Sequence, residues 1–524
     1  MKISNLLALT VLVFPHPVVA AGAGPLVRTV QGELRGTSSA GVDAFLGVPY
    51  AEPPVGQLRW RDPVPAKDWS GVRDATQAAP ACYQQQAKSF GPYTSEFLIG
   101  NAISEDCLYL NIWKPAHLSG PVPVLFYIHG GGFNSGSGSV PIYDGAALAR
   151  RGIVVVTFNY RVGVFGFLAH RELTKESGKH SSGNFGLLDQ IEALRWVRAN
   201  IGAFGGNPRQ VTIAGQSAGA ASVNDLISSP IAKGMFQRAI AQSGSGMGVA
   251  MPSLEEAELT GQRVLAKAGV THIAEFRTLP ADAILAASEI DTPKPGAMPA
   301  LLFAPNFDGV VLTGDPANGA SPIESNVPLL TGFNDQEAGP PPATGAAAAF
   351  EAMVRGRYGN FAQRLLSLYP HSDDAEASSS WKTLARDRYM ASLILWTTAR
   401  TTKSNQTIYT YLFTHAYPGK GWSGAPSAFH TAEVPYVFGT VRCSGLPLSA
   451  SDRAMERMMQ SAWIDFMRSG RPSLNGLHWP AARPASLDVM LLGDRPTMQA
   501  AISTPERFTA LRDYVAAGGT LSLF

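Results

Sequence analysis

A serine lies between two glycines where a predicted strand meets a predicted helix, in the run GQSAG at 215–219. The residues just before it, 211–214, are mostly apolar or β-branched, and those after it are compatible with a helix. Glycines two positions on either side permit a sharp, strained turn that presents the Ser217 hydroxyl to solvent. The pattern also occurs by chance, so the context decides whether Ser217 is a nucleophile or an ordinary residue near a helix N-terminus.

Three consecutive glycines follow another predicted strand. The apolar run 122–128 is typical of a buried strand and leads into His129 and the triple glycine. Backbone N–H groups in such a loop can turn toward one point and hold a negative oxygen. Gly131 and Gly132, completed by the N–H of Ala218, are therefore the candidate oxyanion hole. The alternatives are a flexible loop and a phosphate cradle, and the cradle is disfavoured because no Lys-Ser or Lys-Thr follows at P-loop spacing.

A nucleophilic serine needs a base and an orienting acid, and in folds of this kind the acid and then the histidine follow the serine along the chain. The loop after the predicted strand 327–332 offers two acids, Asp335 and Glu337. A Gly/Pro-rich loop after the next predicted strand carries His415 and His430. Residue patterns alone do not choose within either pair.

Strand and helix signals alternate through the first half of the chain. The run 153–158 is almost continuously apolar, and 187–201 has helical spacing. This alternation predicts an α/β fold with a mostly parallel central sheet and helices on both faces. Such sheets place ligands beyond the C-terminal ends of their strands, just past which the glycine loop, Ser217, the acid and the histidine are all predicted to lie. Irregular segments are expected to insert as the walls of a cleft, namely 82–107, 293–322 and 338–350.

Composition bounds the remaining possibilities. The chain has 524 residues, of which 45% are hydrophobic, and length alone would suggest about three domains. Because the serine, acid and histidine must meet, we expect residues 25–524 to form a single domain with insertions. A net charge of +2 without basic runs gives no reason to expect nucleic acid as a partner.

The N-terminus has the pattern of a secretory signal peptide. Lys2 precedes an apolar stretch over 3–14, and small residues follow around Ala20 to Ala23. We therefore predict a cleaved signal peptide over 1–21 and a secreted or periplasmic mature protein; the alternative is a hydrophobic first strand. No later run is long and apolar enough to predict a membrane span. The oligomeric state is left open.

Six further runs, in the same order along the chain, resemble the type-B carboxylesterase and cholinesterase family of α/β hydrolases, and among its members the bacterial para-nitrobenzyl-esterase type. The likeness extends from about Val27 to the C-terminal region. The matching runs are FLGVPYA at 45–51, EDCLYLN at 105–111, NYR at 159–161, GNFGLLD at 183–189, FGGNP at 204–208 and YVFG at 436–439.

The resemblance implies an α/β-hydrolase fold and a serine carboxylesterase that cleaves small-molecule esters through an acyl-enzyme. By position in the family pattern, Glu337 is the acid and His430 the base of Ser217, and Asp335 and His415 are structural or loop residues. No metal or organic cofactor is implied. The rival functions are a lipase or another ester, thioester or amide hydrolase of the same fold, and a non-catalytic adhesion or binding relative.

The family pattern also implies structural links. Cys82 and Cys107 are expected to form a disulfide that closes a loop near the entrance of the cleft, which fits an oxidising compartment. Cys443 is left as a lone packed or semi-exposed thiol. Two buried ion pairs are implied as scaffold, Arg59 with Glu105 and Arg161 with Asp189.

The chain departs from the family pattern at three places. Gln216 stands where a glutamate usually precedes the nucleophile, and Gln336 and Ala338 replace the aspartate and glycine around the acid. Our hypothesis is that the loss of two carboxylates makes the cleft repel anionic substrates less. The loop 82–107 carries tyrosines and phenylalanines but no tryptophan, so a cholinesterase is not expected.

Overall fold

The structure, a computed structural model, describes residues 24–246, 251–290, 301–318, 322–474, 476–484 and 486–521. The predicted signal peptide, 1–21, lies outside the described residues, as does part of the irregular segment 293–322. All statements below concern the described residues.

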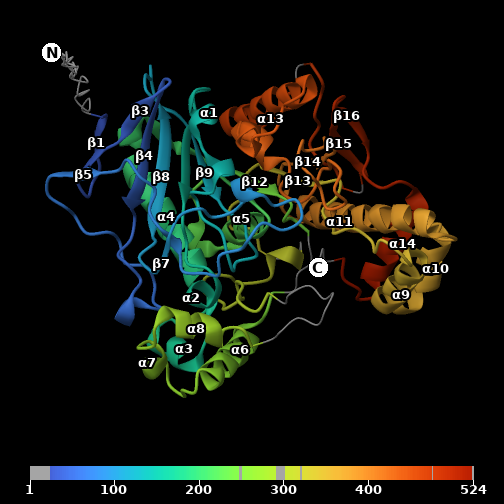
Figure 1. Ribbon diagram of the computed structural model, residues 1–524, viewed down its shortest axis with the longest axis horizontal. Coiled ribbons are helices and arrows are strands. Elements are labelled where there is room, and N and C mark those ends of the chain that lie inside the picture. The colour runs from blue at the N-terminus through green and yellow to red at the C-terminus, as the bar shows by residue number, and fades with distance from the viewer. Residues whose placement is uncertain are drawn as a thin grey trace, which may run out of the picture.

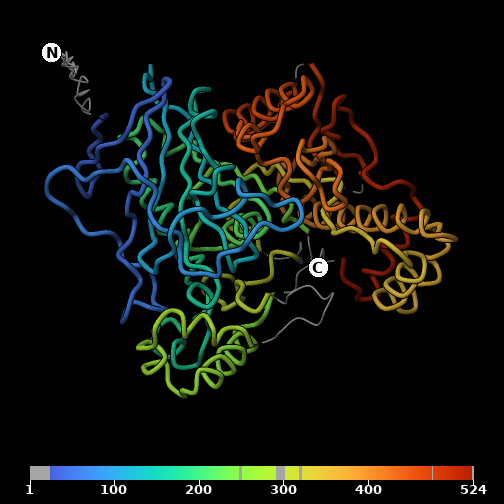
Figure 2. Tube along the Cα trace, in the orientation of Figure 1, coloured from blue at the N-terminus to red at the C-terminus, as the bar shows by residue number. Residues whose placement is uncertain are grey.

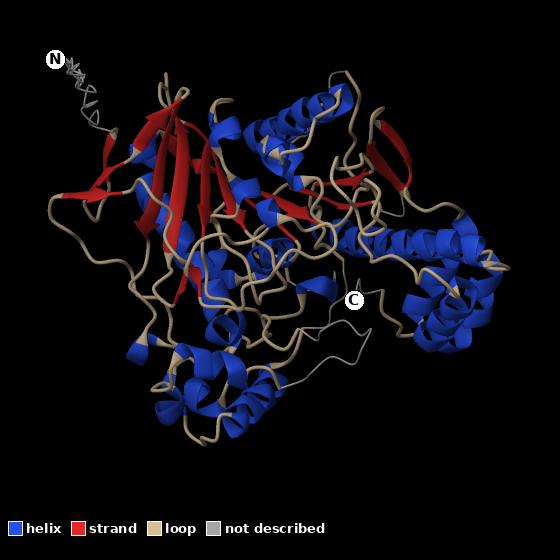
Figure 3. Ribbon diagram, in the orientation of Figure 1, coloured by secondary structure: helices blue, strands red, loops and turns tan. Residues whose placement is uncertain are grey.

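A central sheet runs through the molecule (Figure 3). It has eleven strands in the order β16-β15-β14-β13-β12-β11-β9-β10-β8-β4-β3. The seven strands from β15 to β10 are parallel to their neighbours, and the outer pairings, β16 with β15 and β10 through β3, are antiparallel. The predicted mostly parallel sheet is confirmed. Its strands are β3 (Thr37–Ser39), β4 (Val42–Pro49), β8 (Tyr109–Pro115), β9 (Val122–Ile128), β10 (Val154–Phe158), β11 (Gly206–Gln216), β12 (Arg238–Gln242), β13 (Leu329–Asn334), β14 (Ile408–Phe413), β15 (Asp488–Leu492) and β16 (Thr497–Ala500).

Two small sheets lie outside the central one. The first has the order β1-β2-β5, and the second pairs β6 with β7. Their strands are β1 (Leu26–Arg28), β2 (Glu33–Arg35), β5 (Val72–Asp74), β6 (Ala81–Cys82) and β7 (Ile103–Ser104).

Helices cover both faces of the sheet and extend into a separate lobe (Figure 1). Figure 1 shows α9, α10, α11 and α14 gathered beyond the β14 side, and α3, α6, α7 and α8 grouped at the bottom of the view. The helices are α1 (Ala146–Ala149), α2 (Gly163–Phe167), α3 (Arg171–Glu176), α4 (Phe185–Asn200), α5 (Ala218–Ser228), α6 (Leu254–Lys267), α7 (Ile273–Phe276), α8 (Ala281–Ala287), α9 (Ala346–Tyr358), α10 (Ala362–Leu368), α11 (Asp374–Ser404), α12 (Val434–Phe438), α13 (Ala450–Ser469) and α14 (Pro505–Ala516).

Successive side chains of a strand point to opposite faces of the sheet, so the core has two layers. On β9, Phe126 and Ile128 belong to a core that includes residues of α4, α5 and α11, whereas Leu125 and Tyr127 belong to a core that includes residues of α1, α12 and α13. A strand between two helical layers must be apolar on both sides. This is why the run 122–128 is almost continuously hydrophobic and was recognisable in the sequence.

A disulfide joins Cys82 and Cys107, as the family resemblance implied, with their Cα atoms 4.9 Å apart. The loop that it closes reaches the C-terminal half of the chain (Figure 2). There, Tyr93 Oη donates to the backbone oxygen of His430 at 3.0 Å. The third cysteine, Cys443, is free and exposed. No helix in the described ranges is both long and apolar enough to cross a bilayer.

The limits of the predicted strands 122–128 and 408–413 agree with the structure, whereas β11 is longer than the predicted run 211–214 and the strand near the acid is displaced. The predicted strand 408–413 is β14, and the predicted strand 327–332 is displaced, because β13 starts at Leu329 and continues to Asn334. The reason is that Phe333 and Asn334 still pair with Leu412 and Phe413 of β14. Gly332 pairs with Tyr411 of β14, and a Cβ at Gly332 would come 2.3 Å from the Tyr411 oxygen.

Both expected scaffold ion pairs are present. Arg161 donates through Nε and Nη2 to the two carboxylate oxygens of Asp189 at 2.8 and 2.6 Å, and both side chains are buried. Arg59 holds Glu105 in the same two-pronged way, with both distances 2.6 Å. The buried Asp189 carboxylate also accepts the backbone N–H of Arg161, and it therefore fixes the chain just after β10.

We expect Asp189→Ala to lower the free energy of unfolding by about 3–5 kcal/mol, because it leaves the Arg161 guanidinium buried without its counter-charge. The midpoint and slope of urea unfolding, followed by tryptophan fluorescence, measure the change. The control is Lys67→Ala, which removes an 81% exposed partner of Glu52 and should cost no more than about 1 kcal/mol. Equal losses in the two variants would contradict the scaffold role.

Candidate active site

Ser217 occupies a strained corner between β11 and α5. It is the N-cap of α5, with φ 58° and ψ −125°, a backbone conformation that residues other than glycine rarely adopt. Its backbone N–H donates to the oxygen of Gln242 on β12 at 2.9 Å, which holds the corner at the C-terminal edge of the sheet. The predicted strand-to-helix turn at GQSAG is present.

The flanking glycines are required by close backbone contacts. A Cβ at Gly219 would come 2.1 Å from the oxygen of Ile128, and one at Gly215 would come 2.4 Å from the oxygen of Gly219. Real Cβ atoms do not approach so closely. The two glycines therefore let the first turn of α5 lie directly against the end of β9, where the glycine loop begins.

The glycine loop lies beside the serine corner. A Cβ at Gly130 would come 3.2 Å from Cβ of Ser217, and Gly131 and Gly132 have φ of 114° and 61°. The N–H groups of Gly131 and Gly132 donate to no other group in the part of the chain that the structure describes. Ala218 is the first residue of α5, so its N–H has no acceptor within the helix.

Contacts of His129 and Gln84 stabilise the glycine loop. The His129 ring stacks on Tyr160, with centroids 4.3 Å apart, and burial lowers the pKa of His129 to about 4, so the ring stays neutral. The Gln84 side chain donates to the oxygen of Gly136 and accepts its N–H, at 2.9 and 2.7 Å. Gln84 belongs to the disulfide-closed loop, which therefore fixes the end of the glycine loop.

Both carboxylate oxygens of Glu337 take part in hydrogen bonds. Its Oε1 accepts from Ser243 Oγ and from the backbone N–H of Asn334, both at 2.6 Å, and its Oε2 bonds Nδ1 of His430. The carboxylate side chain is 0% exposed. A buried carboxylate with this set of donors has a fixed direction, as an acid that orients an imidazole needs.

His430 is brought to Glu337 by a short extension of the sheet. Gln336 and Phe429 form an isolated parallel bridge, in which Gln336 N donates to the oxygen of Ala428 at 3.0 Å. His430 does not lie just past β14, where the sequence analysis placed it, because a long loop separates the two. The bridge continues the β13–β14 pairing beyond the strands and so places the two side chains together.

The side-chain amide of Gln216 contacts the other nitrogen of His430. Gln216 Nε2 lies 3.0 Å from His430 Nε2, and an amide N–H at this distance requires an unprotonated Nε2, with the proton on Nδ1 toward Glu337. Burial lowers the pKa of His430, but the charge and hydrogen bond of Glu337, with a smaller effect of Glu433, outweigh it and raise the pKa overall. Within the described residues, no hydrogen bond joins the Ser217 hydroxyl to His430.

The other two candidates from the sequence lie elsewhere. The Asp335 side chain pairs with Arg386 at 3.4 Å, whereas its backbone oxygen accepts from Tyr389. His415 is buried between Asp494 and Asp452, at 2.8 and 3.0 Å.

A second buried acid, Glu433, lies at the N-terminal end of α12 near His430 and was missed by the sequence analysis. It accepts from Asn334 Nδ2 at 2.5 Å and Gln242 Nε2 at 3.1 Å and is 0% exposed. Burial, and then the charge of Glu337, raise the pKa of Glu433 to about 7. The only signal available was an acid three residues after His430, which has no meaning before the fold is known.

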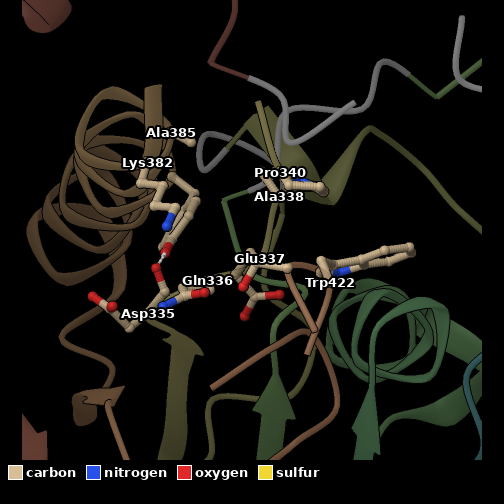
Figure 4. A pocket seen from close by; sticks show the side chains of 11 residues that line it. Asp335, Gln336, Glu337, Ala338, Pro340, Lys382, Ala385 and Trp422 are labelled. Atoms are coloured by element: carbon tan, nitrogen blue, oxygen red, sulfur yellow. Dashed lines mark hydrogen bonds between the residues drawn. The ribbon is translucent and has the colours of Figure 1, made fainter. Parts of the chain in front are cut away.

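Two pockets flank the site. One is lined by Ser217, Ala218, Gly132 and Phe133, opens to solvent and has mostly apolar walls. The other lies along Asp335 to Pro340, with Lys382 and Ala385 of α11 on one side and Trp422 on the other (Figure 4). Trp422 packs against Phe90 and Tyr93, so the loop 82–107 does meet a tryptophan, supplied by a distant segment. No cluster of three or more His, Cys, Asp or Glu side chains in the described ranges is placed to hold a metal ion.

Comparisons with known proteins identify the family. The model of the carboxylesterase family matches residues 23–508. The chain is 36% identical over 485 residues to fumonisin B1 esterase of Sphingopyxis macrogoltabida, which covers 88% of this chain and 86% of that protein. It is 34% identical over 492 residues to para-nitrobenzyl esterase of Bacillus subtilis (strain 168), covering 90% and 96%. A solved PNB esterase structure superposes with a TM-score of 0.76 at 33% identity, over 93% of this chain and 99% of that one.

The sheet order and the serine corner at its C-terminal edge are those of an α/β hydrolase, as the solved esterase structures are. The chain belongs to the carboxylesterase family and is a carboxylic ester hydrolase.

Glu433 gives the folded protein a characteristic pH dependence. Its pKa of about 7 lies above the ordinary carboxyl value of 4.5, so between these two values the folded protein holds a proton that the unfolded chain has lost, and stability falls as pH rises. We expect Glu433→Gln to remove this pH dependence. Between pH 4.5 and 7 the free energy of unfolding of the variant should therefore rise by roughly 3 kcal/mol relative to that of the wild type. Urea unfolding at several pH values checks it. The control is Glu351→Gln, at a side chain that is 44% exposed, and it should leave the wild-type pH dependence in place. An unchanged curve in Glu433→Gln would refute the assignment.

Proposed function

We propose that this chain is a serine carboxylesterase that hydrolyses small-molecule carboxylic esters through an acyl-enzyme, with Ser217, His430 and Glu337 as its triad. The observation that supports it most is that buried Glu337 contacts Nδ1 of His430 while the strained corner presents Ser217 at the wall of a pocket. We include in the proposal that residues 25–524 act as one domain and that 1–21 is removed during export.

The proposed first half-reaction is attack on the ester carbonyl. His430 Nε2 takes the proton of Ser217 as its oxygen bonds the carbonyl carbon, and Glu337 stabilises the imidazolium that results. The negative oxygen is held by the N–H groups of Gly131, Gly132 and Ala218, which donate to no other acceptor among the described residues. His430 then gives its proton to the leaving alcohol, and the ester bond breaks.

The second half-reaction returns the enzyme to its starting state. Water adds to the acyl-enzyme while His430 Nε2 accepts its proton, and the proton passes to Ser217 as the carboxylic acid leaves. No cofactor is needed in this scheme, because every proton is exchanged between His430 and the reactants.

The hydrogen bond between Gln216 and His430 affects the base in this reaction. In the resting structure Nε2 of His430 faces the Gln216 amide, so the reaction requires Nε2 to turn to the hydroxyl of the next residue, Ser217. The amide stabilises the same tautomer that the base needs. A neutral amide does so without adding a charge beside the reacting atoms.

We expect Ser217→Ala to lower kcat by roughly 10⁴ to 10⁶, measured with 4-nitrophenyl esters of varied acyl length. A fluorophosphonate probe should label the wild type at Ser217 and leave the variant unlabelled. Near-normal turnover in the variant, or labelling at another serine, would reject the proposed nucleophile.

We expect Gln216→Glu to move the acid limb of the pH–activity profile to higher pH. A carboxylate beside Nε2 favours the protonated imidazole and so raises the pKa of His430, whereas activity needs the neutral ring. The profile of kcat/KM measures the shift. Gln499→Glu, an exposed substitution on β16, is the matched control and should not move it.

The same variant tests the hypothesis on anionic substrates. The added charge should reduce kcat/KM for carboxylate-bearing esters more than for neutral esters of the same size. Equal reductions for both classes would end the hypothesis. Other acids of the pocket are common to both proteins and cancel in this comparison.

A further inference from the structure

The disulfide-closed loop 82–107 contacts both halves of the proposed site through two side chains. Gln84 is 1% exposed and bonds to Gly136, at the end of the glycine loop. Tyr93 bonds to the backbone oxygen of His430. Neither side chain takes part in the proton transfers of the proposed mechanism. Any effect of theirs on the reaction must therefore act through the groups that they hold.

The N–H groups of the proposed oxyanion hole are directed by the carbonyl groups opposite them. In a planar trans peptide unit the C=O and the N–H point in opposite directions. The Gly131 oxygen accepts from the backbone N–H groups of Asn134 and Ser135, at 3.1 and 3.0 Å, and from Ser135 Oγ at 3.2 Å. Because these donors hold the Gly131 carbonyl on one side, the N–H of Gly132 in the same peptide unit faces the other side.

Gln84 holds the segment that supplies these donors. Its Nε2 donates to the Gly136 oxygen at 2.9 Å, and its Oε1 accepts the Gly136 N–H at 2.7 Å. The same Nε2 donates to the oxygen of Cys82 at 2.8 Å, which fixes the amide beside the disulfide. Gly136 follows Ser135 directly, and a Cβ at Gly136 would come 2.4 Å from the Gly130 oxygen. The segment is thus held closely against the start of the glycine loop.

The glycine loop needs such support because part of its backbone is strained. Gly131, Gly132 and Phe133 have φ of 114°, 61° and 60° in succession. Glycine adopts positive φ readily, whereas Phe133 does so at a cost, and strained backbone persists only where surrounding contacts fix it. Without the two bonds from Gln84 to Gly136, the loop would sample other conformations, and its N–H groups would be directed less often at the substrate oxygen.

Tyr93 holds the backbone of the histidine. Its hydroxyl donates to the His430 oxygen at 3.0 Å, and its ring packs on Phe429, with the centroids 5.8 Å apart. Burial raises the pKa of Tyr93, so the phenol stays protonated and remains a donor. The next residue, Thr431, has φ of 84°, which is strained for a β-branched residue. The bond from Tyr93 therefore fixes the peptide unit between His430 and a strained residue.

We propose that Gln84 and Tyr93 are positioning residues for the ester hydrolysis. Gln84 acts through Gly136 on the direction of the oxyanion-hole N–H groups. Tyr93 acts through the backbone of His430 on the position of its imidazole. This inference rests on the proposed function and adds that one disulfide-closed loop sets the geometry of both halves of the site.

The test compares Gln84→Met and Tyr93→Phe, which nearly keep the size of each side chain and remove its hydrogen bonds. Active sites are first counted by complete titration with a fluorophosphonate, so that all values are expressed per active site. We expect kcat/KM for 4-nitrophenyl acetate to fall about tenfold to hundredfold in Gln84→Met, which is less than the loss of an oxyanion donor itself. In Tyr93→Phe we expect a fall of about twofold to tenfold, as for one hydrogen bond.

A trifluoromethyl ketone separates positioning from a merely structural role. Ser217 Oγ bonds the ketone carbon, the carbonyl electron pair becomes an anionic oxygen, and the serine proton passes to His430 Nε2, so the adduct needs both halves of the site. Affinity for hexyl trifluoromethyl ketone should fall by the same factor as kcat/KM in each variant. Affinity for hexanol, which forms no oxyanion, should change by less than about twofold. A structural role would lower the number of titrated sites and leave the values per site unchanged.

The same loop supplies matched controls. For Gln84→Met the control is Gln86→Met, at an exposed residue of the loop. For Tyr93→Phe it is Tyr83→Phe, which removes a hydroxyl that donates to Asp282 of α8. Both controls should keep the wild-type values per site. Gln84→Asn, with a shorter amide, provides the reading if Gln84→Met does not fold, as judged by thermal unfolding.

The double variant tests whether the two residues act separately. Because Gln84 and Tyr93 hold different halves of the site, their effects on kcat/KM should multiply to within a factor of about two. A double variant no worse than Gln84→Met alone would overturn the separate roles. Unchanged values per site in the single variants, or equal losses for the ketone and hexanol, would overturn positioning altogether.

The wild type distinguishes this inference from the function on which it rests. A wild-type protein that neither hydrolyses the ester nor takes the fluorophosphonate label would reject the proposed serine esterase. Normal hydrolysis and labelling in the wild type, with the same values per site in the variants, would reject the positioning roles alone.

Discussion

The close contact between α5 and β9 is the constraint on which the site depends. With no side chain at Gly219, the helix can rest on the oxygen of Ile128, and this contact sets the serine corner against the glycine loop. The price is a backbone at Ser217 with φ of 58°, maintained by the pairing of β11 with β9 and β12 on either side. The Ser217 hydroxyl, the N–H groups of the glycine loop and the pocket wall on α5 all take their positions from this one contact.

The acid and the histidine depend on a second, longer-range arrangement. Glu337 lies just beyond β13, and its carboxylate is held by Ser243, which follows β12, so two neighbouring strands fix it. His430 arrives through the bridge between Gln336 and Phe429. In place of the two carboxylates usual in the family, this chain has Gln216 at the ring of His430 and Gln336 in the bridge, so the negative charge nearest the imidazole comes from Glu337 and Glu433 alone among the groups that shift its pKa.

The fold and most of the motif positions were predictable because their signals are local. The run 122–128 and the segments 153–158 and 408–413 are buried on both faces, so they read as continuous apolar runs, and the glycines at 215 and 219 mark a corner that permits no Cβ. The strand β13 was misplaced by two residues because the pairing partner of Asn334 is not visible in its own sequence. The resemblance to the family, not the residue pattern, distinguished Glu337 from Asp335.

What the sequence could not reveal were features made by residues from distant segments. Glu433 and Trp422 have ordinary surroundings in the chain and acquire their settings only through the fold. The same is true of Asp225, which in the sequence is one polar residue in a helix and in the structure is a buried acid that lines the pocket beside Ser217. Sequence patterns record the periodicity of an element, whereas the polarity of a pocket depends on which elements meet there.

The contact between Gln216 and His430 joins positions 214 residues apart. Closing a loop of this size has an entropic cost that must be met before the contact contributes anything, and such topologies fold slowly. The strands between the two positions, β12, β13 and β14, must all be in register before the imidazole can be placed. During refolding, helical structure should thus return well ahead of the ability to turn over an ester, and catalytic competence becomes a late reporter of the completed sheet.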